Sequence, residues 1–195
     1  PGSGKTQLLE RTAQALKDKV TMAVIEVDLE TENDAKRLRE QGIRAHQIAT
    51  GSACHLDAHL VHKALHDFPL EVDGQGTDIL FIENVGNLVC PAAFDLGQHI
   101  NVVLLSTTEG DDKPAKYPVM FRSADLVVIS KADLLPYMDG FDVDRAEQSL
   151  RGLGVETPVL TAAAGRETDI SAWIEWLETQ LSDHRQKAEL TASVA

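Results

Sequence analysis

The sequence predicts a doubly wound α/β fold, with a mostly parallel sheet that is covered by helices on both faces. Short apolar, β-branched runs alternate with amphipathic stretches along the 195 residues, as in chains built from repeated β–α units. Three of these runs, at residues 78–83, 101–105 and 126–130, are nearly continuous in hydrophobic residues. Strands of a parallel sheet buried on both faces have this composition, so these three runs carry the fold assignment.

The individual elements follow from the same two patterns. Apolar runs bounded by polar or glycine-rich segments predict strands at residues 20–27, 43–49, 78–83, 100–105, 126–130 and 158–161. A first helix is expected to start at Gln7, and amphipathic stretches predict further helices at residues 31–41, 53–68 (stopped by Pro69), 117–123, 143–152 and 170–181. The chain after Ser182 is polar or small, so we expect one domain over residues 1–182 and a polar, fraying C-terminal tail over residues 183–195.

Composition excludes several classes of function. The net charge of −13, from 18 basic and 31 acidic residues, argues against a surface for nucleic acid or for an anionic membrane. No apolar run approaches the length of a membrane span. The two cysteines each lie in a distinctive local motif, which favours functional thiols in a reduced compartment over a disulfide framework. We therefore expect a cytoplasmic protein that binds neither nucleic acid nor membrane.

The chain opens with Pro-Gly-Ser-Gly-Lys-Thr, the end of the phosphate-loop pattern G-x-x-x-x-G-K-[ST]. Backbone amides of Gly2, Ser3 and Gly4 would surround phosphate oxygens at the start of a helix. Lys5 would reach the β- and γ-phosphates, and the Thr6 hydroxyl suits a Mg²⁺ ligand. The first glycine of the pattern and the strand that feeds the loop would precede residue 1, so we expect an N-terminally truncated domain. The alternative is a glycine-rich turn that caps a helix.

Polar or glycine-rich segments follow the predicted strands, at the sheet edge where ligands of such folds collect. One of them, Ser-Lys-Ala-Asp, is close to the guanine-selecting pattern N-K-x-D, with Ser130 in place of asparagine. Asp133 could accept hydrogen bonds from N1–H and from the exocyclic amine of guanine, which adenine cannot offer, and Lys131 would pack along the base. Ala162, after the last strand, would provide a backbone donor to guanine O6. The alternative for Lys131 and Asp133 is a surface turn before a helix.

Two carboxylates at strand ends complete the expected nucleotide site. Asp28 follows one strand, and Glu83 begins Glu-Asn-Val-Gly, which has the layout of D-x-x-G with Gly86 placed to sense the γ-phosphate. Magnesium prefers hard oxygen ligands, so Thr6, Asp28 and Glu83 are its candidates, and Asp28 could instead orient the attacking water. We expect Lys5, Asp28 and Glu83 to be the catalytic residues of γ-phosphate hydrolysis. Alternatively, the two carboxylates are helix caps or turn residues.

Soft metal ligands lie beyond two of the same strands. Thiolates and imidazole suit nickel, zinc or copper and not magnesium, which makes Cys54, His55 and Cys90 a candidate metal site. Three ligands leave the coordination sphere incomplete, and a second chain could complete it. Because Gly86 is expected to move on GTP hydrolysis, a metal held by nearby Cys90 would respond to the nucleotide state. The alternative is two structural thiols and a capping histidine.

These motifs together resemble the hydrogenase nickel-incorporation GTPases, the HypB family. The resemblance extends from residue 1 to about residue 181 and depends most on Cys-His-Leu-Asp-Ala and on Glu-Asn-Val-Gly-Asn-Leu-Val-Cys-Pro-Ala. It implies a SIMIBI-like P-loop GTPase G domain over residues 1–182, with GTP or GDP and Mg²⁺ as cofactors and with Ni²⁺ or Zn²⁺ held at a dimer interface by Cys54, His55 and Cys90. Val27 and Ser130 depart from the family pattern, which commonly has glycine and asparagine there.

The same resemblance implies a GTP-hydrolysing nickel metallochaperone. It would dimerise with nucleotide, work with a nickel-binding hydrogenase maturation partner and deliver nickel to the large subunit of [NiFe]-hydrogenase. The alternatives are a urease nickel-accessory GTPase, whose metal motif resembles a single Cys-Pro-His run, a nickel or zinc storage or sensor protein with a vestigial nucleotide site, and a P-loop kinase. A preference for ATP would favour the kinase.

Four histidines have helical spacing in the segment that follows Cys54. His55, His59, His62 and His66 are four, three and four residues apart, so they would form one stripe of the helix predicted at residues 53–68. We hypothesise that His59, with His62 or His66, forms an auxiliary nickel reservoir or a transfer path. The alternative is a solvated polar face.

Overall fold

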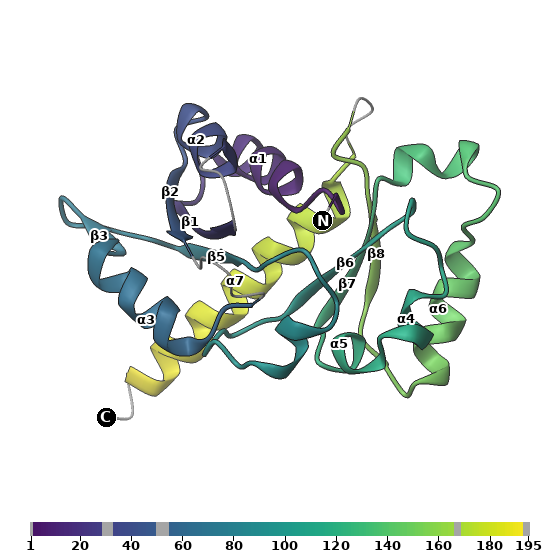
Figure 1. The fold of residues 1–195 in the computed structure, drawn as a ribbon. Coiled ribbons are helices and arrows are strands. Elements are labelled where there is room, and N and C mark those ends of the chain that lie inside the picture. Colours follow the sequence, from purple (N-terminus) through teal and green to yellow (C-terminus); the bar gives the residue numbers. More distant parts are fainter. Residues whose placement is uncertain (1, 29–32, 50–54, 166–168, 193–195) are drawn as a thin grey trace.

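The computed structural model describes residues 2–28, 33–49, 55–165 and 169–192 (Figure 1). The strands are β1 (Met22–Asp28), β2 (Arg44–Ala49), β3 (Glu71–Val72), β4 (Gln75–Gly76), β5 (Ile79–Glu83), β6 (Val102–Ser106), β7 (Leu126–Ser130) and β8 (Val159–Ala162). The helices are α1 (Lys5–Leu16), α2 (Asn33–Glu40), α3 (Ala58–Asp67), α4 (Lys113–Lys116), α5 (Pro118–Arg122), α6 (Val143–Gly152) and α7 (Ser171–Ala192), with the 3₁₀ helices η1 (Cys90–Ala93) and η2 (Ala132–Tyr137). In the described ranges no helix is both long enough and apolar enough to cross a membrane.

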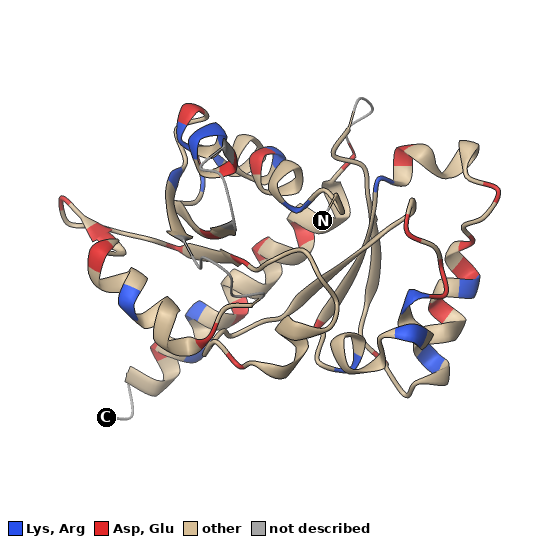
Figure 2. Cartoon of the chain, in the orientation of Figure 1, with Lys and Arg blue, Asp and Glu red and all other residues tan. Residues whose placement is uncertain are grey.

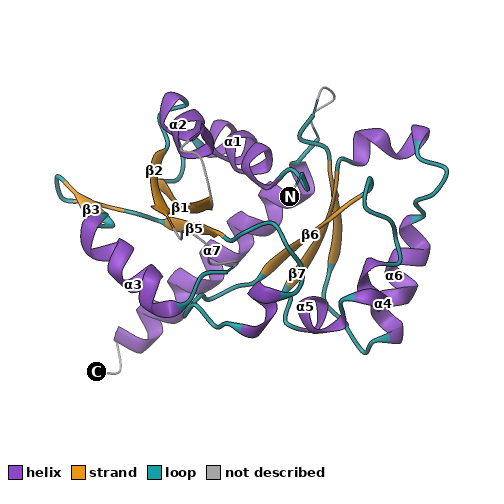
Figure 3. Cartoon of the chain, viewed as in Figure 1, coloured by secondary structure: helices purple, strands orange, loops and turns teal. Residues whose placement is uncertain are grey.

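The six longer strands form two parallel groups, drawn as orange arrows in Figure 3. One group has the order β2-β1-β5 and the other the order β6-β7-β8, and all four pairs are parallel. Among the described residues β5 and β6 do not pair with each other, so the strands make two three-stranded sheets instead of one continuous sheet.

Helices cover both faces of the strands, as the sequence predicted. In β1, Val24 packs with α1 and α2, whereas its neighbour Ile25 faces α3. In β7, Val128 packs with α1 and α7, whereas Ile129 faces α5 and α6. Successive side chains of a strand point to opposite faces, so both strands are buried on two sides. All residues of β7 are buried, which confirms the interpretation of this hydrophobic run as an interior strand.

Helix α7 crosses behind both sheets and joins them (Figure 1). One core cluster contains Leu8 of α1, Leu126 of β7 and Leu177 of α7, with side chains of β5 and β6 packed against it. Within this cluster the indole Nε1 of Trp173 donates to the hydroxyl of Thr12 at 2.8 Å, and both groups are buried. The two sheets therefore share one core although their strands do not pair.

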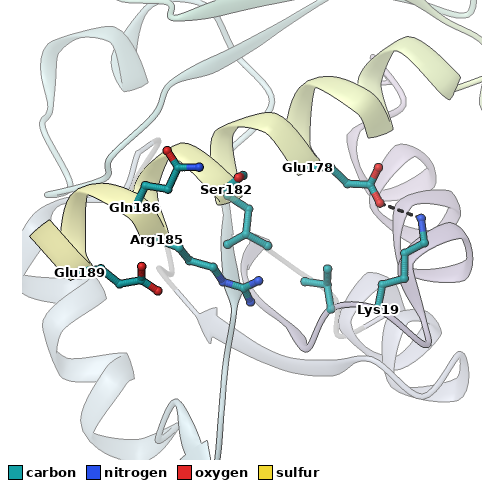
Figure 4. Close-up of a pocket in the computed structure, with 8 residues that line it drawn as sticks. Lys19, Glu178, Ser182, Arg185, Gln186 and Glu189 are labelled. Carbon is teal, nitrogen blue, oxygen red and sulfur yellow. Dashed lines mark hydrogen bonds and ion pairs between the residues drawn. The ribbon is translucent and has the colours of Figure 1, made fainter.

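Helix α7 also corrects the expected fraying after Ser182. The helix continues to Ala192, and residues 183–192 are mostly exposed. Many of them are strong helix formers, and the side chain of Arg185 pairs with Asp78 ahead of β5. Figure 4 shows the adjoining groove, where Glu178 accepts from the Lys19 ammonium at 2.8 Å. The polar composition was misread as a tail, because a fully exposed helix has the same residues.

Helix α3 begins later than predicted. Asp57 has an extended backbone with a φ of −124°, and its carboxylate accepts from the Leu60 N–H at 2.8 Å, which makes it the N-cap. His55 therefore precedes the helix and does not belong to the predicted stripe. Residues 50–54, and with them Cys54, lie outside the described residues.

Short elements between the main strands were not predicted. The β3–β4 hairpin turns through Asp73 and Gly74, both with positive φ, and Asp-Gly is a favoured pair for such two-residue turns. Helices α4, η1 and η2 were also missed, because elements of four to six residues leave little periodic signal. The helix predicted at residues 117–123 is present as α5.

Lys and Arg residues lie mostly on the helices and are interspersed with acidic residues (Figure 2). In one of these pairs the carboxylate is largely shielded from water while the arginine is exposed: the Arg145 Nε donates to the Asp111 carboxylate at 2.7 Å, and the Asp142 N–H donates to it at 2.9 Å. Burial alone would raise the pKa of Asp111, but these hydrogen bonds outweigh it and hold the pKa below its usual value. Next to it, Asp112 pairs with Lys116 in an exposed position.

Candidate functional site

The loop at the start of the chain has the backbone that an anion site requires. Gly2 and Gly4 have φ values of 77° and 84°, which are accessible to glycine at little cost. Gly4 is the N-cap of α1, and its carbonyl accepts from the Leu8 N–H at 2.9 Å, so the free amides of the first turn lie at the positive end of the helix. The glycine-rich turn and the helix that was predicted to follow it are therefore present in the expected order.

Ser130 holds this loop from the neighbouring strand. Its hydroxyl, at the end of β7, donates to the Ser3 carbonyl at 2.7 Å in a buried hydrogen bond. Ser130 and Ser3 are 5% and 9% exposed, so water has little access to either group. The departure from N-K-x-D that the sequence analysis noted thus keeps a donor between this motif and the phosphate loop.

Lys5, Thr6 and Glu83 are brought together at the start of α1. The Lys5 ammonium lies 3.6 Å from Glu83 Oε1, and the Thr6 hydroxyl lies 3.1 Å and 3.2 Å from the two Glu83 oxygens. Burial raises the pKa of the Glu83 carboxyl, while Lys5 and Thr6 act in the opposite direction and nearby Asp34 adds to the increase. Because burial makes the Glu83 carboxyl difficult to ionise, a cation bound beside it would stabilise its ionised form.

Asp34 is a part of this cluster that the sequence analysis missed. Its Oδ2 lies 3.4 Å from the Thr6 hydroxyl, and its Oδ1 accepts from Arg37 at 3.2 Å. The available signal was an acidic residue in the first turn of the helix after β1, which is common for reasons of the helix dipole alone. The oxygens of Thr6, Glu83 and Asp34 form a hard donor set that fits Mg²⁺.

Two other predicted residues lie at the same edge of the sheet. Asp28 is the last residue of β1, which pairs with β5, the strand that ends at Glu83. Gly86 lies in the loop that leaves β5, three residues after Glu83. Their positions agree with the expected arrangement at the carboxyl ends of the strands.

Asp133 lies in η2, beside the segment that follows β8. Its Oδ1 is buried and has no hydrogen-bond partner among the described residues. Its Oδ2 is so close to Gly165 that a Cβ built there would lie 2.7 Å from it, so only glycine leaves the carboxylate this position. A buried acceptor without a donor is costly, which makes Asp133 Oδ1 a candidate to accept a hydrogen bond from a ligand.

The residues around Asp133 are fixed by the backbone of the neighbouring loops. Lys131 has a left-handed φ of 58°, and its carbonyl accepts from the Thr107 hydroxyl at 3.1 Å. The Lys131 ammonium is 3.3 Å from the Thr108 hydroxyl. Ala162 lies opposite Ser130 in the β7–β8 register, and the next amide, of Ala163, donates to the Asp169 carbonyl at 2.8 Å.

The segments that contain the soft metal ligands also meet. Asn84 accepts at one side-chain oxygen from the Leu56 N–H at 3.3 Å and from the Val85 N–H at 2.8 Å. This atom therefore links the residue after His55 to the loop between Glu83 and Gly86. The His55 ring stacks on Phe94, with centroids 3.8 Å apart, and Phe94 directly follows η1.

Cys90 is the first residue of η1, and the Asn87 side chain orients it by accepting from the Cys90 N–H at 2.9 Å. The described ranges contain no group of three or more His, Cys, Asp and Glu residues arranged to hold a metal, but Cys54 is not among the described residues. His55 and Cys90 thus lie in contacting segments on the same edge as the nucleotide residues.

Comparison with known proteins gives a consistent assignment. The family model of the CobW/HypB/UreG nucleotide-binding domain matches residues 1–161. Hydrogenase maturation factor HypB of Escherichia coli K12 is 50% identical over 180 residues, which cover 92% of this chain and 60% of that protein. Hydrogenase/urease maturation factor HypB of Helicobacter hepaticus is 46% identical over 186 residues, covering 95% of this chain and 76% of that protein.

Solved structures agree with the sequence matches. The crystal structure of HypB from Helicobacter pylori in complex with nickel has a TM-score of 0.87 and 41% identity, and the match covers 94% of this chain and 84% of that one. The chain spans about 60% of the length of the first curated relatives that it matches. It carries the nucleotide-binding domain that these proteins share, on the α/β fold predicted above. The chain belongs to the HypB family of hydrogenase maturation factors, within the CobW/HypB/UreG group of nucleotide-binding domains.

Proposed function

We propose that this protein is a GTP-hydrolysing nickel metallochaperone for the maturation of [NiFe]-hydrogenase, in which metal binding depends on the nucleotide state. The observation that carries the proposal is the Asn84 side chain. One oxygen of Asn84 accepts from the backbone beside His55 and from the backbone between Glu83 and Gly86. A movement of this loop with the nucleotide would therefore move the metal-binding segment.

GTP would lie along the carboxyl ends of the strands. The amides of Gly2, Ser3 and Gly4 would bind its phosphates, as the left-handed glycines and the start of α1 support. Asp133, with its unpartnered buried oxygen, would select guanine, while Lys131 packs along the base.

The backbone donor to guanine O6 would come from the segment that begins at Ala162. Ala163 already donates its N–H to Asp169, which leaves the amides of Ala162 and Ala164 as the candidates for this donor. Asp133→Ala is expected to lower the affinity for GTP far more than for ATP, which would also argue against a P-loop kinase.

Thr6, Glu83 and Asp28 would hold Mg²⁺, with Asp34 as a further ligand or as a partner that orients Thr6. The ion supplies charge neutralisation to the phosphates when it is bound. Lys5 would move from Glu83 to the β- and γ-phosphate oxygens. Asp28 or Glu83 would orient a water molecule for in-line attack, in which the new oxygen–phosphorus bond forms at the γ-phosphorus and the bond to the β,γ-bridging oxygen breaks. Gly86 would contact the γ-phosphate through its N–H and release it on hydrolysis.

Ni²⁺, or Zn²⁺ in its place, would be bound as cargo by Cys54, His55 and Cys90. Apolar side chains are exposed around this segment, with Val89 at 63% and Phe94 at 40% exposure, and Val119 of neighbouring α5 at 61%. Such a surface supports a homodimer that forms with nucleotide and completes the metal site. We place the protein in the cytoplasm, where it would accept nickel from a nickel-binding maturation partner and deliver it to the hydrogenase large subunit.

The proposal is tested by nickel calorimetry on the full-length protein, with GDP and with a non-hydrolysable GTP analogue. Wild type should change its nickel affinity or stoichiometry between the two nucleotides, and Cys90→Ala should lose that change. Asn84→Ala should keep nickel binding but lose the dependence on nucleotide. Asp125→Ala is a matched control, because the Asp125 carboxylate also accepts from a backbone N–H distant in the sequence, that of Asn101 at 2.7 Å, away from this loop. Identical nickel binding in both nucleotide states would reject the coupling and favour a storage or sensor protein.

Delivery to urease is a second candidate, favoured by the Helicobacter hepaticus relative, which is a hydrogenase/urease maturation factor. Activation of both enzymes in cells that lack this protein separates the candidates. Loss of hydrogenase activity alone would reject the urease role.

A further inference from the structure

Helix α3 presents histidines on its exposed side. His59, His62 and His66 are all exposed, while Val61 and Ala64 on the opposite side are buried against β1 and β2. This packing fixes the rotation of the helix, so the three imidazoles face outward. The contacts of the three imidazoles differ.

His62 and His66 converge on one point. Their Nε2 atoms lie 3.2 Å apart, and their rings meet edge to face with centroids separated by 4.7 Å. Residues four apart on a helix are neighbours, which explains the approach. No corresponding contact of His59 occurs among the described residues.

The distance between the two nitrogens matches that of two ligands on one metal ion. With metal–nitrogen bonds of about 2.0–2.1 Å, nitrogens 3.2 Å apart subtend an angle of about 100–106° at the ion. This value lies between the angles of octahedral and tetrahedral coordination. Pairs of histidines at i and i+4 on one helix face bind zinc in this way in metalloproteases.

We propose that His62 and His66 form a second metal site, separate from Cys54, His55 and Cys90, which binds a divalent transition-metal ion such as Ni²⁺ through both Nε2 atoms. Imidazole nitrogen suits nickel, zinc and copper. With the metal bound, each ring is neutral and carries its proton on Nδ1; the proton that one Nε2 donates to the other in the metal-free pair moves through water to Nδ1 of its own ring, so both Nε2 lone pairs are available to the ion. Water fills the remaining positions, so the ion exchanges readily.

Charge favours a cation at this position. His66 is in the last turn of α3, where the negative end of the helix dipole attracts cations, and His62 lies one turn before it. The net charge of −13 adds a general attraction. His62 lies about 6 Å and His66 about 12 Å along the helix axis from the first residue of α3, which follows the His55 segment. The pair would therefore bind an ion of its own, apart from His55.

The test is calorimetric titration of the full-length protein with Ni²⁺ in saturating GDP, for wild type, His62→Ala, His66→Ala and His59→Ala. His62→Ala and His66→Ala should each lose one nickel equivalent per chain, and the double variant should lose no more than that, since the two ligands act as a unit. His59→Ala is the matched control and should bind as much nickel as wild type. Cys90→Ala should keep the His62–His66 equivalent, so a failure of the Cys90 site is distinguishable from a failure of this one.

A second readout does not depend on stoichiometry. Paramagnetic Ni²⁺ added at low ratios to Cys90→Ala should broaden the ring resonances of His62 and His66 before those of His59. Unchanged binding in both His62→Ala and His66→Ala would overturn the proposal. An equal loss in His59→Ala would also overturn it, because the metal would then be held by a general histidine-rich surface.

Discussion

Removal of the Ser130 hydroxyl should loosen the phosphate loop. In the wild type the Ser3 carbonyl accepts a buried hydrogen bond from Ser130 at 2.7 Å. Ser130→Ala removes this donor at a position where water has little access. Leaving a buried acceptor unsatisfied costs about 1–3 kcal/mol, and the free energy of unfolding should fall by that amount. If the same free energy is spent in ordering the loop around phosphates, the GTP affinity should fall by about 5- to 150-fold.

Urea unfolding and GTP-binding titrations of the full-length protein measure both effects. Ser123→Ala is a matched control, because the Ser123 hydroxyl also donates to a backbone carbonyl, that of Met120 at 2.9 Å, but in an exposed position. It should change the free energy of unfolding by less than about 0.5 kcal/mol. Ser130→Thr keeps a hydroxyl and should recover most of the loss. The reasoning is refuted if Ser130→Ala costs no more than Ser123→Ala in both measurements.

Three further predictions concern stability. Asp111→Asn should destabilise the protein by about 1–3 kcal/mol at neutral pH, and Asp112→Asn, at an exposed ion pair, by less than about 0.5 kcal/mol. Because the pKa of Asp111 is lowered, its contribution is present above the pKa of the unfolded chain and is lost as pH falls through the folded-state value, which urea titrations at decreasing pH would detect. Burial raises the pKa of Glu83, so the contribution of this carboxyl to stability is full below the pKa of the unfolded chain and is lost as pH rises through the folded-state value. Glu83→Gln should therefore stabilise the magnesium-free protein at neutral pH, and this gain should vanish in acid. A variant as stable as wild type at both pH values would contradict the prediction. Gly4→Ala, at a φ of 84°, should cost about 1–2 kcal/mol in thermal unfolding, whereas Gly140→Ala, whose φ lies outside the left-handed region, should be near neutral.

The sequence predicted the interior of the fold better than its surface. The strand at Leu126–Ser130 was predicted with its observed bounds, because burial on two faces demands a continuous hydrophobic run. Helix α7 beyond Ser182 was missed, since an exposed helix needs no apolar period and its anchor at Asp78 is distant in the sequence. The start of α3 was misplaced because Asp57 was overlooked as an N-cap, which marks where a helix begins.

The candidate site was predicted where a motif fixes the residue type and missed where only folding brings residues together. Lys5, Thr6 and Glu83 were named from their patterns, and the structure brings them into contact. Asp34 carried no such pattern. The role of Asn84 also required coordinates, because its two hydrogen bonds join segments 28 residues apart in the sequence.

The core that α7 shares with α1 has a consequence for how the chain folds. Trp173 and Thr12, which form its buried hydrogen bond, are separated by 161 positions in the sequence. During synthesis β5, β6 and β7 leave the ribosome before α7, so the side chains that they pack against α7 stay uncovered in the meantime. Contacts of such long range are slow to form, and apolar strands left waiting are prone to aggregate. The nascent chain is thus most exposed to misassembly between the emergence of β5 and that of α7, which is the interval when a chaperone would have the largest effect on its yield.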